Sequence, residues 1–390
     1  MRAVLRMGGR ITITAGLTVL GLRRLVFIGA AVLPPRPRRD APAPKSLSLV
    51  VAARDEASGL DSVLESVAAI DTHPLHVILV DDGSSDGTAT TMERWTRARP
   101  HWSMLSLSRG AGKAAALNAG IAAAPDTDLI AVCDADVHLA PDSLAEITRA
   151  FADPRVGGAS AILWPANADT SIVTRYCALE LWQHQLITCA AKDRLRLNPP
   201  TLGWFSCYRR EALNQVGGFA PASLGEDVQA TTALVSAGWR TRFIATARVI
   251  GEVPMTVDDF VRQHVRWARG LHDSAPALSA SSVGNMIEGW LHAAGYIDRV
   301  LVLAAALLVL RGRLSPRMPA VYLSLTAAEA VVALARADKL QSAPRFLAAA
   351  VAMFPVDAAA ATAGSALQLL RRERTWHSPR RVRPRTGDTP

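Results

Sequence analysis

The chain has 390 residues, of which 50% are hydrophobic and 20% are charged. This composition excludes intrinsic disorder and a collagen-like repeat for most of its length. The formal net charge of +9 favours anionic partners such as nucleic acid, nucleotide phosphates or the cytoplasmic face of a membrane. None of the four cysteines forms a CxxC pair. A structural zinc site and a disulfide scaffold are therefore not expected, and a reducing compartment fits.

Residues 1–45 combine apolar sequence with basic sequence. Two apolar stretches, Ile11–Leu22 and Leu25–Leu33, are divided by two arginines and followed by a stiff linker rich in proline and arginine. A cleaved signal peptide is one interpretation. Because no clear small-residue cleavage site follows, we favour an uncleaved anchor or an interfacial helix. The paired arginines would be costly in the middle of a membrane span.

From residue 46 to about 254, strands and helices are expected to alternate. The predicted strands are Ser48–Ala52, His76–Val80, Trp102–Leu107 and Asp128–Cys133, and the predicted helices are Gly59–Ala69, Thr88–Arg99 and Lys113–Ala124. This order predicts βαβ units in an α/β domain, with a mainly parallel sheet covered by helices on both faces. In such sheets ligands bind beyond the carboxyl ends of the strands.

After residue 254 the sequence becomes basic and then strongly apolar. Met255–Leu271 is predicted to be a basic amphipathic helix. Three apolar segments follow, Val300–Leu310, Met318–Ala335 and Phe346–Leu370. A straight span needs about 20 apolar residues, so these are marginal spans, and some are expected to lie in the interface. The arginine-rich tail is expected in the cytoplasm.

Five regions follow from these patterns. They are an anchor or interfacial helix with its basic linker (1–45), an α/β domain (46–254), amphipathic interface helices (255–290), membrane helices (291–370) and a basic tail (371–390).

Acidic residues follow the first two predicted strands. The first strand runs into Asp55, and the second into Asp81 and Asp82. Two like charges at the ligand edge of a sheet repel each other unless something binds them. Asp86, further along the same turn, has a simpler interpretation, since it could cap the helix that begins near Thr88.

The fourth predicted strand ends in Asp134-Ala-Asp136. On an extended chain, residues i and i+2 point the same way. Both carboxylates could then meet one divalent cation, and hard oxygen ligands suit Mg²⁺ or Mn²⁺.

Residues 110–115 read Gly-Ala-Gly-Lys-Ala-Ala. Because Ala114 follows Lys113, the loop lacks the hydroxyl that a Walker A motif places on Mg²⁺. It is similar to a degenerate dinucleotide fingerprint, with Asp134 about 20 residues further on. A nicotinamide-dependent oxidoreductase is therefore an alternative, although two βα units precede the loop and that fingerprint belongs after a domain's first strand.

Two further motifs lie downstream. Asp227 precedes a helix expected from about Val228, so capping of that helix is one interpretation. Gln263, Arg266 and Trp267 occupy positions i, i+3 and i+4 on the basic helix and share one face. A guanidinium beside an aromatic ring suits a phosphate and a sugar or base. The alternative is a membrane-surface helix with an interfacial tryptophan.

Taken together, the motifs resemble those of glycosyltransferase family 2, the inverting GT-A class. Within it the chain is most similar to the membrane-bound branch of hyaluronan, cellulose, chitin-oligosaccharide and poly-N-acetylglucosamine synthases. The motifs occur in the family's order across residues 46–270. They are Val51-Ala-Ala-Arg-Asp55-Glu56, Asp81-Asp82-Gly83-Ser84, Gly112-Lys113 through Asn118, Asp134-Ala-Asp136, Gly225-Glu226-Asp227 and Gln263-x-x-Arg266-Trp267.

The resemblance implies a GT-A fold, which is Rossmann-like and binds a nucleotide sugar, together with interfacial and transmembrane helices. It also implies roles for single residues. Asp55 and Asp82 would touch the uracil and ribose of a UDP-sugar, and Lys113 would lie near that nucleotide. Asp134 would face the donor, Asp136 would hold the metal, and Asp227 would be the general base. The diphosphate would be bound, and the acceptor framed, by Gln263, Arg266 and Trp267. The family often has Asn-Glu where this chain has Asp55-Glu56.

The expected activity is a metal-dependent, inverting transfer from a nucleotide sugar to an acceptor hydroxyl at the membrane, with Mg²⁺ or Mn²⁺ as cofactor. The expected partners are a donor such as a UDP-sugar, a saccharide or lipid-linked acceptor, and membrane lipid, but not nucleic acid. A processive β-polysaccharide synthase and an enzyme that adds one sugar both remain open. The expected location is the cytoplasmic membrane, with the catalytic domain facing the cytoplasm.

Overall fold

The computed structural model describes residues 2–36, 44, 46–70, 75–108, 110–221, 225–274, 287 and 298–369. The chain forms two compact units. The sheet unit includes Arg36–Asn167 and Asn198–Val253, and the helical unit includes Met1–Pro35, Ala168–Leu197 and Pro254–Pro379. Parts of the predicted linker and of the regions 255–290 and 291–370, as well as the whole basic tail, lie outside the described residues.

The sheet unit contains the strands and helices predicted for the first half of the α/β domain, and further elements after them. Its strands are β1 (Leu47–Ala53), β2 (Leu75–Asp81), β3 (Trp102–Ser106), β4 (Leu129–Asp134), β5 (His138–Leu139), β6 (Val156–Pro165), β7 (Phe205–Arg209) and β8 (Arg240–Gly251). Its helices are α2 (Leu60–Ala68), α3 (Thr88–Arg97), α4 (Lys113–Ala123), α5 (Ser143–Thr148), η1 (Arg149–Ala152), α8 (Arg210–Gln215) and α9 (Glu226–Ser236).

These strands form one mixed sheet in the order β3-β2-β1-β4-β7-β6-β8-β5. β1 pairs in parallel with β2 on one side and with β4 on the other. Their register places Ala53 opposite Asp81 and Ala52 opposite Asp134. The carboxyl ends of β1, β2 and β4 therefore meet at one edge, at the point where the strand order reverses. The expected mixed, mainly parallel α/β sheet is confirmed.

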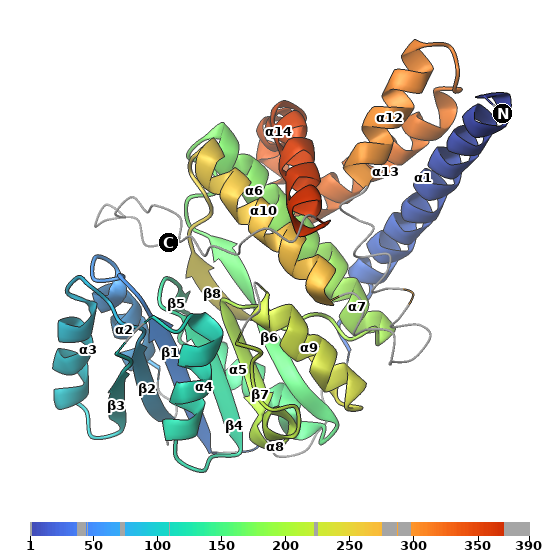
Figure 1. The fold of residues 1–390 in the computed structure, drawn as a ribbon. Coiled ribbons are helices and arrows are strands. Elements are labelled where there is room, and N and C mark those ends of the chain that lie inside the picture. The colour runs from blue at the N-terminus through green and yellow to red at the C-terminus, as the bar shows by residue number, and fades with distance from the viewer. Residues whose placement is uncertain are drawn as a thin grey trace. The chain divides into compact units, whose positions relative to one another are not determined.

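Helices α4, α8 and α9 pack on one face of this sheet (Figure 1). Their shared core includes Val50, Val80, Leu117, Phe219 and Leu234. Helix α4 lies very close to the strands, because a Cβ atom added at Gly120 would come within 2.5 Å of Val50 and 2.8 Å of Val80. This packing fixes the amino end of α4 beside the carboxyl ends of β1 and β2.

The local geometry expected at the end of β4 is wrong. β4 ends at Asp134, and the chain then turns through Ala135 and Asp136. The Asp134 N–H donates to the carbonyl of Trp204 at 3.0 Å, while the Val137 N–H donates to the Asp134 carbonyl at 3.5 Å. The two carboxylates are thus placed by a turn and not by the side-chain alternation of an extended strand.

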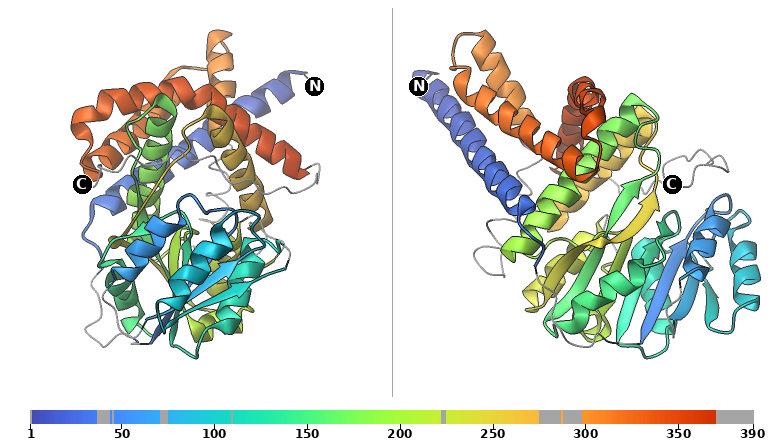
Figure 2. Two further views of the ribbon diagram at one scale, coloured as in Figure 1. Left: turned by 90° about the vertical axis from the view of Figure 1, so that its left-hand side faces the viewer. Right: turned by 180° about the vertical axis from the view of Figure 1, so that it is seen from behind.

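The helical unit gathers segments from three parts of the chain. Its elements are α1 (Arg2–Val32), α6 (Ile172–Trp182), the π-helical η2 (Gln183–Cys189), α7 (Ala190–Leu195), α10 (Val257–Ser274), α12 (Asp298–Leu310), α13 (Arg317–Arg336), η4 (Leu340–Ser342) and α14 (Ala343–Leu369). Within the unit α1 packs against α12 and α13, and α14 packs against α10 and α6 (Figure 2).

Three helices among the described residues are long and apolar enough to cross a membrane. The candidate spans are Arg10–Val32, Arg317–Arg336 and Leu340–Gly364, of 23, 20 and 25 residues. Helix α12 is shorter, at 13 residues. Candidate membrane helices are thus present, as the fold class anticipated.

The first candidate span contains Arg24, whose cost in an apolar environment is offset by partners on other helices. Its Nη2 atom lies 2.8 Å from Asp298 Oδ2, its Nη1 atom contacts Glu329, and its Nε donates to the Tyr322 hydroxyl at 3.1 Å. A charge inside a membrane helix is tolerated when it faces such partners.

Candidate active site

The turn after β1 is tied to the turn after β2 through Asp55. Asp55 Oδ1 accepts hydrogen bonds from the backbone N–H of Ser85 at 2.7 Å and from its hydroxyl at 3.0 Å. Asp55 has a φ of +56°. Asp and Asn tolerate this left-handed region better than other residues with a side chain. An aspartate is therefore well suited to this turn.

Asp82 shapes the glycine loop that precedes α4. Its two carboxylate oxygens accept hydrogen bonds from the backbone N–H of Ala111 at 2.6 Å and of Gly112 at 3.0 Å. Gly112 has a φ of +90°, which a residue with a side chain rarely adopts. The predicted contact of Asp82 with a ribose stays a prediction.

The neighbouring acids of this turn have structural roles. Asp81 Oδ1 accepts a hydrogen bond from the Ser84 N–H at 3.1 Å. Asp86 Oδ1 accepts one from the Thr88 N–H, the first residue of α3, at 2.9 Å. Asp86 thus bonds the first residue of α3, but the N-cap position that the simpler interpretation gave it is occupied by Gly87.

Lys113, the first residue of α4, joins acids from two other elements. Its ammonium nitrogen lies 2.6 Å from Asp134 Oδ1 at the end of β4 and 3.0 Å from Glu226 Oε1 at the start of α9. Its Nζ is also 3.4 Å from the carbonyl oxygen of Gly203. The sheet edge and the amino ends of two helices thus converge on one cation.

Asp227 faces the same group. Its Oδ2 atom accepts a hydrogen bond from the Gly203 N–H at 2.9 Å, and its Oδ1 atom accepts one from the Val228 N–H at 2.8 Å. A Cβ atom at Gly203 would lie 3.1 Å from Lys113 Nζ and 3.3 Å from Asp227 Oδ2. A side chain at residue 203 would therefore crowd Lys113 and Asp227.

This crowding of charges shifts the proton affinities. Burial, followed by the negative charge of Glu226, raises the pKa of Asp227 to about 6, although Lys113 acts in the opposite direction. Burial lowers the pKa of Lys113, but the charges of Asp134 and Glu226 outweigh it, and the net pKa is well above the ordinary value. Asp227 is therefore a stronger base than an exposed aspartate, and Lys113 stays cationic.

The acids at the end of β4 fit a divalent cation. Burial raises the pKa of Asp134 to about 6, and the nearby negative charge of Asp136 adds to that rise while Lys113 opposes it. Asp136 Oδ1 is itself a buried oxygen. The neighbouring carboxylates of Asp134 and Asp136 supply the hard oxygen ligands that Mg²⁺ and Mn²⁺ prefer.

The remaining predicted residues belong to the other unit. Gln263, Arg266 and Trp267 lie on α10, and all three are partly buried. The structure brings Lys113, Asp134 and Asp227 together within the sheet unit. An approach of the α10 motif to these acids stays a prediction.

Two members of this group, Glu226 and Gly203, have no predicted role of their own. Glu226 adjoins Asp227 within the Gly225-Glu226-Asp227 string, and this adjacency could have indicated from the sequence that Glu226 belongs to the site. Gly203 has no such signal, since it lies in a turn before β7, and only the fold brings it beside Lys113.

Comparison with known proteins finds relatives that share sequence with this chain. The chain is 28% identical over 308 residues to an N-acetylglucosaminyltransferase of Rhizobium meliloti (strain 1021), covering 71% of this chain and 72% of the relative. It is 31% identical over 220 residues to one of Neorhizobium galegae, covering 54% and 51%. The chain thus spans about half the length of this second relative.

Among solved structures, a mannosyltransferase of Pyrobaculum calidifontis in complex with GDP-Man and Mn²⁺ has a similar fold. The TM-score is 0.66 at 20% identity, and the match covers 94% of this chain and 100% of that one. The sequence model of the family described as "Glycosyltransferase like family 2" matches residues 43–270. The chain therefore belongs to glycosyltransferase family 2, and it is a glycosyltransferase with a GT-A fold.

Proposed function

We propose that this protein transfers N-acetylglucosamine from UDP-N-acetylglucosamine to an acceptor hydroxyl at a membrane, with inversion at the anomeric carbon. The observation that carries the proposal is the convergence of Lys113, Asp134, Glu226 and Asp227 at the carboxyl edge of the sheet. The names of the relatives support the choice of sugar. The three candidate spans support action at a membrane, and we infer the cytoplasmic membrane with the sheet unit on the cytoplasmic side.

In this proposal Asp227 is the general base. An acceptor hydroxyl is a poor nucleophile, so a carboxylate must take its proton as it attacks the anomeric carbon. With a pKa of about 6, Asp227 is mostly ionised at neutral pH and still basic enough to accept that proton. A single in-line displacement of this kind inverts the anomeric centre.

The leaving diphosphate develops negative charge, which cationic groups must stabilise. Lys113 is held at the edge of the sheet for this purpose, and Arg266 would supply a second cation from α10. Asp134 and Asp136 would hold Mg²⁺ or Mn²⁺, which supplies Lewis-acid stabilisation of the departing oxygen. Asp55 and Asp82 would position the nucleoside.

The test is the variant D227N in the full-length protein. An amide cannot accept the proton, so we expect turnover of UDP-N-acetylglucosamine to fall by roughly 10²–10⁴-fold. Donor binding should persist, because the amide that replaces the carboxylate keeps the shape of the side chain. Labelled sugar transfer and a UDP-dependent shift in thermal unfolding measure the two quantities. Near-normal turnover by D227N would show that Asp227 is not the general base.

Family membership also bears on the nicotinamide alternative. The loop that resembles a dinucleotide fingerprint is held by Asp82 through the backbone N–H groups of Ala111 and Gly112. We expect thermal stabilisation by UDP with Mn²⁺ and none by NAD(H). Stabilisation by NAD(H) and not by UDP with Mn²⁺ would favour the nicotinamide-dependent oxidoreductase.

The length of the product is a second question. The Gln263-x-x-Arg266-Trp267 motif supports repeated addition, since the resemblance places it in polymer-forming enzymes. Mass spectrometry of products after incubation with UDP-N-acetylglucosamine should then show a ladder. A single adduct on a lipid or small acceptor would indicate a non-processive enzyme.

A further inference from the structure

A buried ionic network lies inside the helical unit, centred on Arg299 of α12. Its guanidinium contacts Asp357 of α14 and lies 3.2 Å from Glu180 Oε1 of α6 and 3.3 Å from Asp298 Oδ1. The Tyr176 hydroxyl donates to Asp357 Oδ2 at 2.6 Å. Three helices are thus held together by charge-assisted bonds among largely buried side chains.

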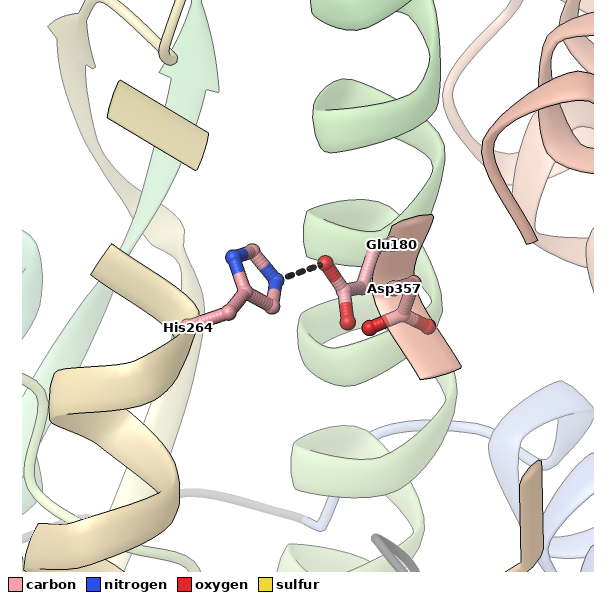
Figure 3. Close-up of side chains that lie close together, drawn as sticks. All are labelled: Glu180, His264 and Asp357. Atoms are coloured by element: carbon pink, nitrogen blue, oxygen red, sulfur yellow. Dashed lines mark hydrogen bonds and ion pairs between the residues drawn. The ribbon is translucent and has the colours of Figure 1, made fainter. Parts of the chain in front are cut away.

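His264 of α10 joins this network. Its side chain is 1% exposed, and its Nε2 atom lies 2.7 Å from Glu180 Oε2. Figure 3 shows the imidazole of His264 pointing at the carboxylate of Glu180, with Asp357 beside that carboxylate. The other ring nitrogen, Nδ1, is 2.9 Å from the carbonyl oxygen of Phe260.

These two contacts fix the protonation of the ring. A carbonyl oxygen can only accept, so Nδ1 must carry a hydrogen to bond Phe260. A carboxylate also accepts only, so Nε2 must carry one to bond Glu180. His264 is then an imidazolium. The local charges agree, because Arg299 faces three carboxylates, those of Glu180, Asp357 and Asp298.

The electrostatics point the same way. Burial lowers the pKa of His264, but the charges of Glu180 and Asp357 outweigh it, and the net pKa lies above that of an ordinary histidine. Burial raises the pKa of Glu180, but His264 and Arg299 lower it to about 2. The ion pair therefore stabilises the fold fully below the ordinary pKa of histidine. This stabilisation is lost as the pH rises through the raised value.

His264 also contacts the motif on its own helix. It follows Gln263 directly, and its ring centroid lies 5.0 Å from that of Trp267 at an interplanar angle of 54°. On its other side it meets Glu180. The imidazolium thus lies between the predicted acceptor-binding tryptophan and the network that holds α6, α12 and α14.

We propose that His264 is a positioning residue, whose imidazolium bond to Glu180 sets α10 and the Trp267 side chain for acceptor binding. This inference rests on the proposed function. It implies that use of the acceptor falls when the imidazole loses its proton. The charged and titratable groups around it are Glu180 and Tyr176 of α6, His184 of η2, Arg299 of α12 and Asp357 of α14.

The same side chains raise the question of a metal. Ligand atoms of Glu180, His264 and Asp357 lie within 4.8 Å of one another. However, Arg299 already contacts both carboxylates. A cation is therefore present where a metal would be needed, and we assign the group to positioning.

The first experiment measures the protonation of His264 and does not depend on enzyme activity. Full-length protein labelled at histidine is placed in lipid nanodiscs, and the His264 resonance, assigned by its loss in H264N, is followed across the neutral and alkaline range. We expect an imidazolium at neutral pH in the wild type and a lower titration midpoint in E180Q. A neutral ring in the wild type, or an unchanged midpoint in E180Q, would overturn the proposal. So would a bound metal that disappears in H264N.

The second experiment measures kcat/KM for the acceptor as a function of pH. In the wild type, kcat/KM for the acceptor should fall as His264 deprotonates. In E180Q the neutral ring can accept a hydrogen bond from the amide, so activity should persist and the alkaline fall should disappear. H264N should lower kcat/KM for the acceptor by roughly ten- to a hundredfold at all pH values, since small misplacements of binding groups are costly.

The control is D258N on the same helix. It removes the exposed Asp258–Arg262 ion pair of 2.9 Å and should leave the pH profile unchanged. An identical alkaline fall in wild type and E180Q would refute the role of His264. If the wild type transfers no sugar, the proposed function fails, but the resonance experiment still decides the protonation of His264.

Discussion

Two neighbouring carboxylates open α9, and the first of them, Glu226, raises the pKa of the second, Asp227. Glu226 pairs with Lys113 at 3.0 Å, while Asp227 bonds the backbone of Gly203 and Val228. After burial, Glu226 is the largest cause that raises the pKa of Asp227. The residue beside the proposed base thus tunes how strongly it holds a proton.

This arrangement predicts an acid limb in the rate. A protonated Asp227 cannot act as a base, so kcat/KM should fall as the pH decreases through about 6. In E226Q one negative neighbour is removed, the pKa of Asp227 decreases, and the limb should move to lower pH. The pH dependence of kcat/KM measures the limb. E93Q, in an exposed ion pair on α3, is the control. A limb that stays in place in E226Q would contradict this account.

At the scale of elements, α10 and α14 cross at Gly364. A Cβ atom there would lie 2.7 Å from Ala268 Cβ and 3.0 Å from the Val265 carbonyl oxygen. Two helices approach this closely only where one lacks a side chain. The crossing brings the motif helix against a candidate membrane span within the helical unit.

G364A tests this crossing. Overpacking should destabilise the helical unit by roughly 1–3 kcal/mol. G29A is a matched control on α1, where a Cβ atom meets nothing within 4 Å. That change should be neutral or stabilising, because alanine favours a helix over glycine by about 1 kcal/mol. Thermal unfolding in detergent compares them. Equal unfolding temperatures for the two variants would count against the close crossing.

The prediction of helices and strands was correct where it rested on a local sequence pattern. Alternating apolar strands and amphipathic helices placed β1 to β4 and α2 to α4 correctly, with ends that differ by one or two residues. The Asp134-x-Asp136 spacing identified the right acids but gave the wrong local geometry. The strand ends at Asp134, whose N–H donates to the carbonyl of Trp204, a residue distant in sequence.

Contacts between distant segments could not be predicted in this way. The Lys113–Glu226 pair and the Arg24–Asp298 pair join residues whose separation carries no periodic signal. His264 illustrates the same limit, because the sequence shows only a histidine beside Gln263. Its role depends on Glu180, which reaches it from another helix.

At the scale of the whole molecule, the two units share the chain in an interleaved manner. The described chain passes between them after Pro35, Asn167, Leu197 and Val253. A piece that ends at Val253 would therefore retain Ala168–Leu197 without its partners. Trp182 of that segment packs on Phe346 of α14, with ring centroids 5.5 Å apart.

This connectivity predicts the behaviour of truncated proteins. Residues 46–253 alone should aggregate, because the apolar side chains of α6 and η2 become exposed. The same piece with Ala168–Leu197 replaced by a Gly/Ser linker should be monomeric and still bind UDP. Size-exclusion chromatography and UDP-dependent thermal shift measure these outcomes. Equal solubility of both pieces would contradict the prediction.

The partners of Arg24 have a consequence for biosynthesis. α1 leaves the ribosome long before Asp298 and Glu329 have been translated. Insertion of a nascent helix with an uncompensated guanidinium costs about 2.5–3.5 kcal/mol. That cost is offset only when α12 and α13 arrive. The ion pairs of this candidate span are therefore completed only after the helical unit has assembled.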